Sequence, residues 1–262
     1  MRYDDAFANA KYIISGAQFP QRWADAAARF RADLGDSARL GVSYGDAPAE
    51  WFDLFLPEGT PEGLMVFIHG GYWRAFGPRD FSHLAAGAVA RGWACAMPGY
   101  TLAPGARIAA ITRQMVRALP RMASEVAGPV VLSGHSAGGH LSARLGNADA
   151  GLPGDLAARI RRIVPISPLS VLAPLIDTAM NADLRLDPAE ARAESPALRS
   201  RRAGFDAHVW VGGAERPAFI DQARRLGNAW ACPVSIDPDR HHFDVIDGLE
   251  TPDTALMRAL LG

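Results

Sequence analysis

The chain contains few cysteines, and none of them stands in a metal-binding pattern. Cys95 and Cys232 are the two cysteines among 262 residues, and both lie in apolar runs. We interpret them as small buried hydrophobic residues, and this low usage fits a reducing compartment. The sequence has no His-Glu-x-x-His motif, no paired Cys motif and no Gly-x-Gly-x-x-Gly fingerprint. We therefore expect no metal, no dinucleotide and no other cofactor.

Long apolar runs and an excess of one charge are also missing. No apolar run approaches the ~18 residues of a membrane-spanning helix, and acidic residues close to Met1 argue against a signal peptide. The 27 basic residues balance 28 acidic ones, so no basic stripe for nucleic acid is present. We expect a cytoplasmic protein that binds a small molecule. We expect it to bind neither a membrane nor nucleic acid. A homodimer is one candidate assembly.

Short apolar runs that alternate with helical segments dominate the chain after a helical N-terminal segment, residues 1–38. Such alternation indicates parallel strands joined by crossover helices. We predict one α/β domain, residues 1–262, with an eight-stranded, mostly parallel sheet and helices on both faces. The long connection 167–204 is expected to be a lid or pocket wall. The expected strands are Arg39–Tyr44, Trp51–Leu56, Leu64–His69, Trp93–Met97, Pro129–Ser133, Arg162–Ile166, Ala207–Val211 and Val234–Asp237, of which the first two form a hairpin.

The strongest motif is Gly-His-Ser-Ala-Gly at 134–138, which lies directly between an expected strand and an expected helix. That context is required of a serine on a strained strand-to-helix turn. The turn exposes the hydroxyl and places the next amide at a helix N-terminus. We therefore predict Ser136 as a nucleophile; the alternative is a glycine-rich turn without chemistry.

A second motif, His-Gly-Gly-Tyr-Trp, follows the third expected strand. A hydrolase that forms a tetrahedral intermediate needs backbone N–H groups aimed at the oxyanion. Adjacent glycines let the backbone turn its amides inward. We expect the amides of Gly70 and Gly71, or of Tyr72, to form an oxyanion hole with that of Ala137. Tyr72 and Trp73 are expected to line the aromatic end of the substrate pocket, with packing against the core as the alternative.

A nucleophilic serine needs a base and an acid, which follow it in the order acid, then histidine. His241 and His242 both follow the last expected strand, and their spacing leaves the choice between them open. Glu215 is the first carboxylate after the strand Ala207–Val211, where it would orient the imidazole. The alternative for Glu215 is a helix N-terminal glutamate. Weaker rivals for the acid are Asp177, Asp206 and Asp221.

Taken together, these residues resemble the hormone-sensitive-lipase-like α/β-hydrolases and, within that fold, the kynurenine formamidase (arylformamidase) group. The similarity extends over nearly the whole chain. It includes the segments 69–73, 100–104, 134–141, 181–183, 194–196 and 242–244. The resemblance implies the α/β-hydrolase fold and a triad of Ser136, Glu215 and His242, because His-Phe-Asp at 242–244 matches the group's pattern. Members often carry Asp where this chain has Glu215, and either carboxylate can orient a histidine.

The resemblance implies a serine hydrolase that transfers a small acyl group through an acyl-enzyme intermediate, without a cofactor. The implied substrate is an aryl formamide such as N-formyl-L-kynurenine, an intermediate of tryptophan catabolism. A broad carboxylesterase for short-chain acyl esters is the alternative. A non-catalytic ligand-binding relative on the same fold is a third hypothesis, and the intact set of serine, acid and histidine argues against it.

Overall fold

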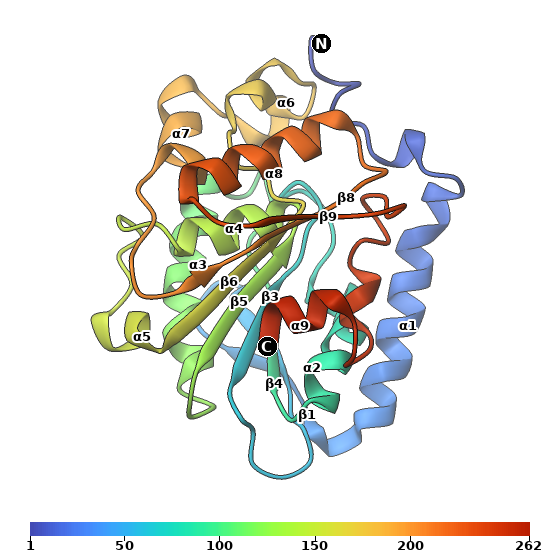
Figure 1. The fold of residues 1–262 in the computed structure, drawn as a ribbon, viewed down its shortest axis with the longest axis vertical. Coiled ribbons are helices and arrows are strands. Elements are labelled where there is room, and N and C mark those ends of the chain that lie inside the picture. The colour runs from blue at the N-terminus through green and yellow to red at the C-terminus, as the bar shows by residue number, and fades with distance from the viewer.

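The computed structural model describes residues 1–262 and contains one nine-stranded sheet with helices on both faces (Figure 1). The strands follow the order β1-β2-β4-β3-β5-β6-β8-β9, and β7 pairs with β6. The first two neighbour pairs, β1–β2 and β2–β4, are antiparallel, and all the others are parallel. The bounds are β1 (Ala38–Ser43), β2 (Trp51–Phe55), β3 (Leu64–Ile68), β4 (Ala94–Pro98), β5 (Val130–His135), β6 (Ile160–Ile166), β7 (Asp206–Ala207), β8 (Val209–Gly212) and β9 (Val234–Asp237).

The prediction of an α/β fold with a mostly parallel sheet is confirmed, and the strand number differs by one. The extra strand arises because the run expected as Ala207–Val211 is divided at His208 into β7 and β8. Of these two strands, β7 pairs with β6 alone, whereas β8 pairs with both β6 and β9. The division therefore lies where the chain gains β9 as a second neighbour.

Helices from different parts of the chain cover the two faces of the sheet. Alternate residues of a strand point to opposite faces, so Val66 and Ile68 of β3 enter one hydrophobic cluster and Met65 and Phe67 enter the other. Helices α3, α4 and α8 supply the first cluster, and α1, α2 and α9 supply the second. The bounds are α1 (Phe19–Leu34), α2 (Ala86–Ala90), α3 (Ile108–Ala123), α4 (Ala137–Leu145), α5 (Gly154–Arg159), α6 (Asn181–Leu184), α7 (Pro188–Ala193), α8 (Pro217–Trp230) and α9 (Ala255–Leu261).

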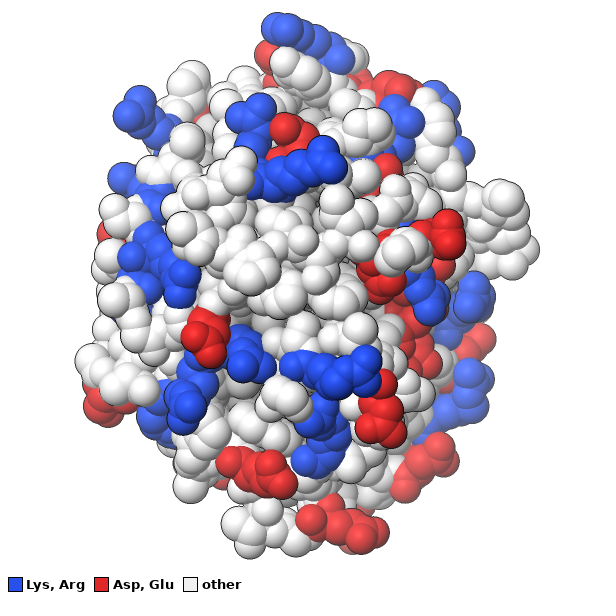
Figure 2. Space-filling view, in the orientation of Figure 1, with Lys and Arg blue, Asp and Glu red and all other residues white.

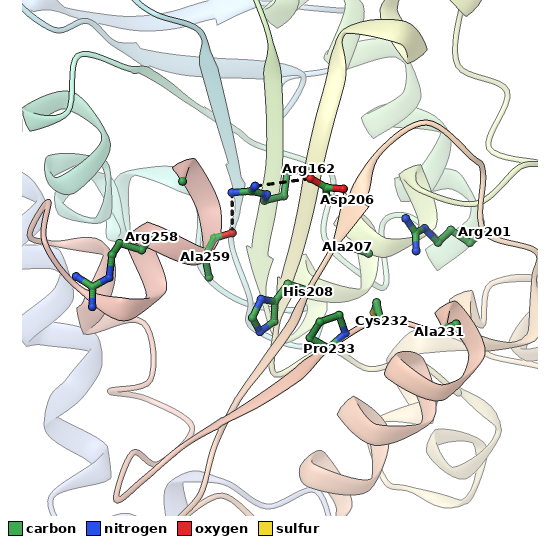
Figure 3. A pocket seen from close by; sticks show the side chains of 11 residues that line it. Arg162, Arg201, Asp206, Ala207, His208, Ala231, Cys232, Pro233, Arg258 and Ala259 are labelled. Carbon is green, nitrogen blue, oxygen red and sulfur yellow. Dashed lines mark hydrogen bonds and ion pairs between the residues drawn. The ribbon is translucent and has the colours of Figure 1, made fainter.

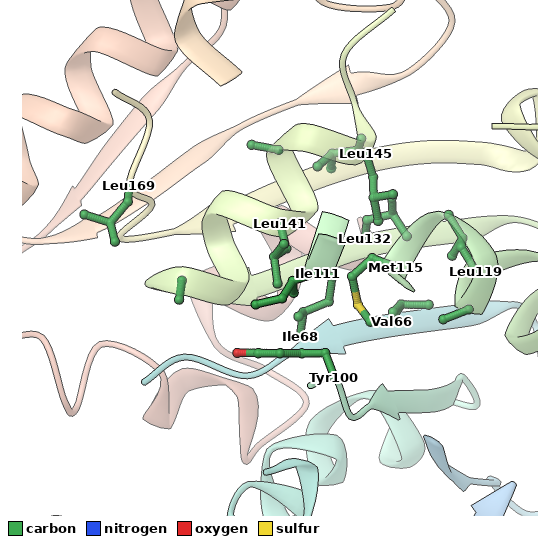
Figure 4. Close-up of a cluster of buried hydrophobic side chains, with 14 of the residues drawn as sticks. Val66, Ile68, Tyr100, Ile111, Met115, Leu119, Leu132, Leu141, Leu145 and Leu169 are labelled. Carbon is green, nitrogen blue, oxygen red and sulfur yellow. The ribbon is translucent and has the colours of Figure 1, made fainter. Parts of the chain in front are cut away.

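The first cluster fixes the position of the strand ends. Figure 4 shows Val66, Ile68 and Leu132 of the central strands beneath Leu141 and Leu145 of α4. All these side chains are buried. Packing of this density leaves little freedom for the turn between β5 and α4, where the motif serine lies.

The segment 167–204 is held to the rest of the domain by buried polar groups. The carbonyl of Glu194 bonds to Nε2 of His140 at 2.6 Å, and its carboxylate accepts a hydrogen bond from Thr112 Oγ1 at 2.6 Å. The Asn181 side chain bonds both backbone groups of Leu186, at 2.7 and 3.1 Å. The two bonds of Glu194 anchor the segment to α3 and α4, and those of Asn181 stabilise a turn within the segment.

Both signs of charge are distributed over the face shown in Figure 2, around a largely uncharged centre. No helix of the protein is both long enough and apolar enough to span a membrane.

Candidate active site

Ser136 occupies a strained turn between β5 and α4. Its backbone has φ 57° and ψ −113°, a region that residues with a side chain rarely adopt. The flanking glycines permit the turn: a Cβ on Gly138 would lie 1.9 Å from the carbonyl oxygen of Ile68, and one on Gly134 would lie 2.3 Å from that of Gly138. The turn therefore requires glycine on both sides of the serine, as the motif does.

His242 and Glu215 form a buried pair. The Nδ1 atom of His242 lies 2.6 Å from Oε2 of Glu215, and both residues are buried. The other oxygen of Glu215 accepts hydrogen bonds from the Gly212 amide at 2.9 Å and from the Ser167 hydroxyl. The His242 ring also packs on Phe219, with centroids 4.2 Å apart. Glu215 is thus held by three donors, one of which is the imidazole.

The other candidates for the base and the acid lie outside this buried pair. Nδ1 of His241 accepts the amide protons of Phe243 and Asp244 at 3.1 Å, so this ring is tied to its own loop. Asp221 pairs with Arg225 on the surface of α8. Asp206 is exposed and pairs with Arg162, and the backbone carbonyl of Asp177 accepts from the Tyr3 amide; neither carboxylate forms an ion pair with a histidine. Of the candidates left open by the sequence, the structure therefore brings His242 and Glu215 together.

The loop after β3 lies beside the serine and carries backbone amides without a hydrogen-bond partner in the protein. The amides of Gly70, Gly71 and Tyr72, and that of Ala137 at the start of α4, donate no hydrogen bond within the protein. Gly71 has φ 105°, and a Cβ there would lie 2.3 Å from the Ala75 carbonyl oxygen. These amides have the chemistry of an oxyanion hole.

His69 holds this loop in place through a hydrogen bond and ring stacking. Its Nδ1 lies 2.8 Å from the carbonyl oxygen of Gly70, and its ring stacks on Tyr100 with centroids 4.3 Å apart. Burial lowers the pKa of His69 to about 4, so the ring is neutral at physiological pH. A neutral, packed imidazole suits a structural role.

The expectation that Tyr72 and Trp73 both line the substrate pocket is wrong for Trp73. Its side chain is fully buried and packs edge-on against His140 of α4, with centroids 5.0 Å apart, and it does not line the cavity beside Ser136. Tyr72 does line that cavity. Both residues have positive φ, 52° and 57°, so the chain turns sharply here and the two aromatic side chains diverge. The alternative of core packing holds for Trp73.

The cavity that contains Ser136 and His242 has a volume of about 490 Å³. Aromatic side chains dominate its wall, and two exposed cations lie there, Lys11 paired with Asp5 and Arg74 paired with Asp183. No residue of 167–204 lines it; residues 7–11 of the N-terminal segment do. The lid role of 167–204 stays a prediction. The aromatic lining residues are Phe7, Trp23, Tyr72, Phe76, Phe81 and Phe243.

Sequence reasoning missed the N-terminal wall and one residue of the serine motif, His135. This side chain lines the cavity and packs on His242 with ring centroids 4.5 Å apart. Burial and the neighbouring His242 lower the pKa of His135 well below its usual value. His135 is thus a neutral neighbour of the His242 imidazole. Its position next to Ser136 in the sequence motif could have indicated a place in the site.

A second cavity, of about 500 Å³, lies at another part of the sheet, and no serine lines it (Figure 3). Arg162, Arg201, Arg258 and His208 line it. Arg162 already donates to the carbonyl oxygens of Ala259 and Leu260 and pairs with Asp206. The arrangement of serine, histidine and free amides occurs in the first cavity, which we take as the candidate active site.

A family model described as the alpha/beta hydrolase fold matches residues 65–231. The chain belongs to this family. Membership of this family, with a curated formamidase relative that covers most of the chain, makes it a hydrolase of the serine-hydrolase type.

Two sequence relatives cover most of the chain. A kynurenine formamidase from Danio rerio is 27% identical over 237 residues, which cover 85% of this chain and 80% of the relative. A protein from Silicibacter sp. TM1040 with a provisional thioesterase name is 51% identical, with complete coverage of both chains and a TM-score of 0.98. An esterase from Pyrobaculum calidifontis shares the fold: its TM-score is 0.69 at 18% identity, with 92% of this chain and 88% of that chain covered.

Proposed function

We propose that the protein hydrolyses an aryl formamide, with N-formyl-L-kynurenine as the leading substrate. The observation that carries the proposal is the cavity itself, in which Ser136 and His242 face an aromatic wall that also holds Lys11 and Arg74. An aromatic wall suits an aryl leaving group, and a cation suits a substrate carboxylate. The similarity to kynurenine formamidases over 85% of the chain supports the same substrate class.

The first half of the reaction forms an acyl-enzyme. His242 takes the proton of the Ser136 hydroxyl, and Oγ attacks the formyl carbonyl carbon. The amides of Gly70, Gly71 and Ala137 stabilise the oxyanion of the tetrahedral intermediate. Glu215, which accepts the Nδ1 proton of His242 at 2.6 Å, keeps the base in the required tautomer and stabilises the imidazolium.

The second half releases both products. The imidazolium of His242 gives its proton to the leaving nitrogen, the C–N bond breaks and the arylamine departs. Water, deprotonated by the same imidazole, then attacks the formyl ester of Ser136 and releases formate. The chemistry uses side chains and backbone amides alone, so no cofactor is required.

A second candidate is the hydrolysis of a short-chain ester or thioester. The relative of 51% identity carries a provisional thioesterase name, and solved neighbours of the same fold are esterases. The same triad would cleave these substrates, with an alkoxide or thiolate as the leaving group.

Steady-state kinetics on three substrates separate the candidates. We would compare kcat/KM for N-formyl-L-kynurenine, p-nitrophenyl acetate and S-phenyl thioacetate, with Ser136→Ala as the control. A formamide value of about 10⁴ M⁻¹s⁻¹ or more, above both other values, supports the proposal. Rapid ester or thioester turnover with negligible formamide cleavage contradicts it. Equal fluorophosphonate labelling of wild type and Ser136→Ala would reject Ser136 as the nucleophile.

A further inference from the structure

Ser167 directly follows β6 and contacts the acid of the triad. It is fully buried, and its hydroxyl forms one hydrogen bond, which it donates to Oε1 of Glu215. Ser167 does not line the cavity that contains Ser136 and His242, so it does not contact a substrate bound there. Any effect of this side chain on the reaction must therefore pass through Glu215.

The backbone places Ser167 between the nucleophile and the acid. The carbonyl oxygen of Ile166 accepts the amide of Ser136 at 2.9 Å, and the amide of Ser167 donates to the carbonyl oxygen of Trp210 at 2.7 Å. Trp210 belongs to β8, and the turn after this strand carries Glu215. The end of β6 thus ties the turn of the nucleophile to the strand of the acid, and the Ser167 hydroxyl adds a side-chain bond to the same connection.

The turn that carries Glu215 is also tied to the loop of the base. The amide of Ala214 donates at 2.9 Å to the carbonyl oxygen of Arg240, two residues before His242. These backbone bonds fix the two turns but not the torsion of the carboxylate. Because a carboxylate is planar, the donors on Oε1 set the direction in which Oε2 faces Nδ1 of His242. Those donors are one backbone amide and the hydroxyl of Ser167.

The backbone of Ser167 is strained. Its φ is 48°, in the left-handed region that residues with a side chain rarely adopt. Glycine adopts this conformation at lower cost, so the sequence keeps a side chain where the backbone favours none. Strain of this kind concentrates at functional sites, where the surrounding structure maintains it. The hydrogen bond to Glu215 is what the side chain contributes at this position.

We propose that Ser167 is a positioning residue of the triad. Its hydroxyl holds the Glu215 carboxylate in the orientation in which Oε2 accepts the Nδ1 proton of His242. When Nε2 takes the proton of Ser136, the positive charge of the imidazolium faces this oxygen. Ser167 keeps its own proton throughout, and no bond forms or breaks at it. The inference rests on the triad of the proposed function and is independent of the substrate that the triad cleaves.

The effect should appear in the rate of the chemical steps. A displacement of about 1 Å at a catalytic group can cost about 100-fold in rate, and Ser167 supplies one of the three donors to the carboxylate. We expect Ser167→Ala to lower kcat for p-nitrophenyl acetate about 10-fold or more, with KM within about 3-fold of wild type. The second-order rate of fluorophosphonate labelling should fall by a similar factor.

Two further variants assign this loss to the hydroxyl. Ser167→Gly also removes the hydroxyl but relieves the positive φ, so it should show the same loss as Ser167→Ala. Ser170→Ala is the matched control. Ser170 is equally buried in the same segment, and its hydroxyl donates to the carbonyl oxygen of Gln222 at 2.6 Å. Its loss should change kcat by less than about 3-fold.

A double-mutant cycle with Glu215→Gln separates positioning from a structural role. Glutamine presents no charge to the imidazolium, so the Ser167 hydroxyl has no carboxylate left to orient. In this background Ser167→Ala should change the labelling rate by less than about 3-fold. A structural role would lower the rate by the same factor in both backgrounds, because independent effects multiply.

The outcomes distinguish this inference from the proposed function. An equal loss in both backgrounds, a rise in KM with kcat unchanged, or a loss in Ser167→Ala that is absent in Ser167→Gly overturns the role of Ser167 while the triad stands. Variants that do not fold overturn it too, because Ser167 would then act on the fold and not on His242; thermal unfolding decides this. Wild type that labels no faster than Ser136→Ala overturns the triad and this inference with it. Ester turnover without formamide cleavage overturns the proposed substrate alone, and the same variants then decide the role of Ser167 on the ester.

Discussion

Replacement of Glu215 by glutamine tests how the buried pair works. The side chain keeps its shape but exchanges one oxygen for an NH₂ group. Both carboxylate oxygens are in use: Oε2 accepts from His242 at 2.6 Å, and Oε1 accepts from the Gly212 amide at 2.9 Å and from the Ser167 hydroxyl. Glutamine can satisfy one of these sides as an acceptor but not both.

The structure predicts in which direction the NH₂ group of the glutamine points. If the NH₂ group faced Gly212, two donors would meet in a buried site, at a cost of about 1–3 kcal/mol. If it faces His242, every group is paired, but Nδ1 must then accept and the proton moves to Nε2. That tautomer cannot take the proton of Ser136. The favoured arrangement of Glu215→Gln is thus the inactive one, and the charge that stabilises the imidazolium is also gone.

We expect these two losses to lower kcat about 10³–10⁴-fold, the range for a triad held in the wrong tautomer. That factor corresponds to about 4–5.5 kcal/mol of transition-state stabilisation. Glu215→Asp is the matched control, because it keeps the charge on a side chain one methylene shorter. Its kcat should fall by at most about 100-fold, less than that of Glu215→Gln, because the charge and the tautomer matter more than the length of the side chain.

The assay should not depend on the natural substrate. The second-order rate of fluorophosphonate labelling reports the activation of Ser136 itself, and kcat/KM for p-nitrophenyl acetate reports turnover. Thermal unfolding of each variant shows that the fold is intact. A folded Glu215→Gln protein that labels and turns over within about 10-fold of wild type would refute the reasoning.

Three further outcomes follow from packing and burial. Gly138→Ala should unfold the protein or cost at least about 3 kcal/mol in urea denaturation, because its Cβ would lie 1.9 Å from the Ile68 oxygen; wild-type stability would contradict this. Trp73→Ala should cost about 3–5 kcal/mol yet leave KM for p-nitrophenyl acetate unchanged, and a selective rise in KM would place Trp73 in the pocket after all. Burial raises the pKa of Asp247 to about 6, above its value of about 4 in an unfolded chain. Its ionisation therefore destabilises the fold as pH rises through 6, so Asp247→Asn should raise the urea midpoint more at about pH 8 than at about pH 4.5; an equal change at both pH values would contradict the assignment.

Local chemistry explains why much of the fold could be predicted from the sequence. The observed bounds of β9 match the predicted ones. The helix before it, α8, begins at Pro217, because proline is favoured at the first position of a helix. The last helix begins at Ala255, because Thr254 caps it by accepting the Met257 amide at 3.1 Å. Helix ends depend on a single capping bond, which periodicity alone does not locate.

The motifs of the candidate site could also be predicted from local chemistry, because the residues of each motif form their own backbone turn. The divergence of Tyr72 and Trp73 could not. Alternation along a strand does not apply where two successive residues have positive φ. Only the turn decides which aromatic ring reaches the cavity and which enters the core.

The N-terminal wall depends on contacts that no local pattern encodes. Arg216, the neighbour of Glu215, bonds to Asp5 at 3.0 Å and stacks over the Tyr12 ring at 3.8 Å. Asn9 reaches Tyr72 across 63 positions of the sequence. Each partner is an ordinary polar or aromatic residue, and periodicity shows that a face is buried without showing what covers it. The residues that close the cavity are therefore held by the loops that carry the acid and the free amides. A change in either loop should alter substrate preference through residues 5–12 as well as through the triad.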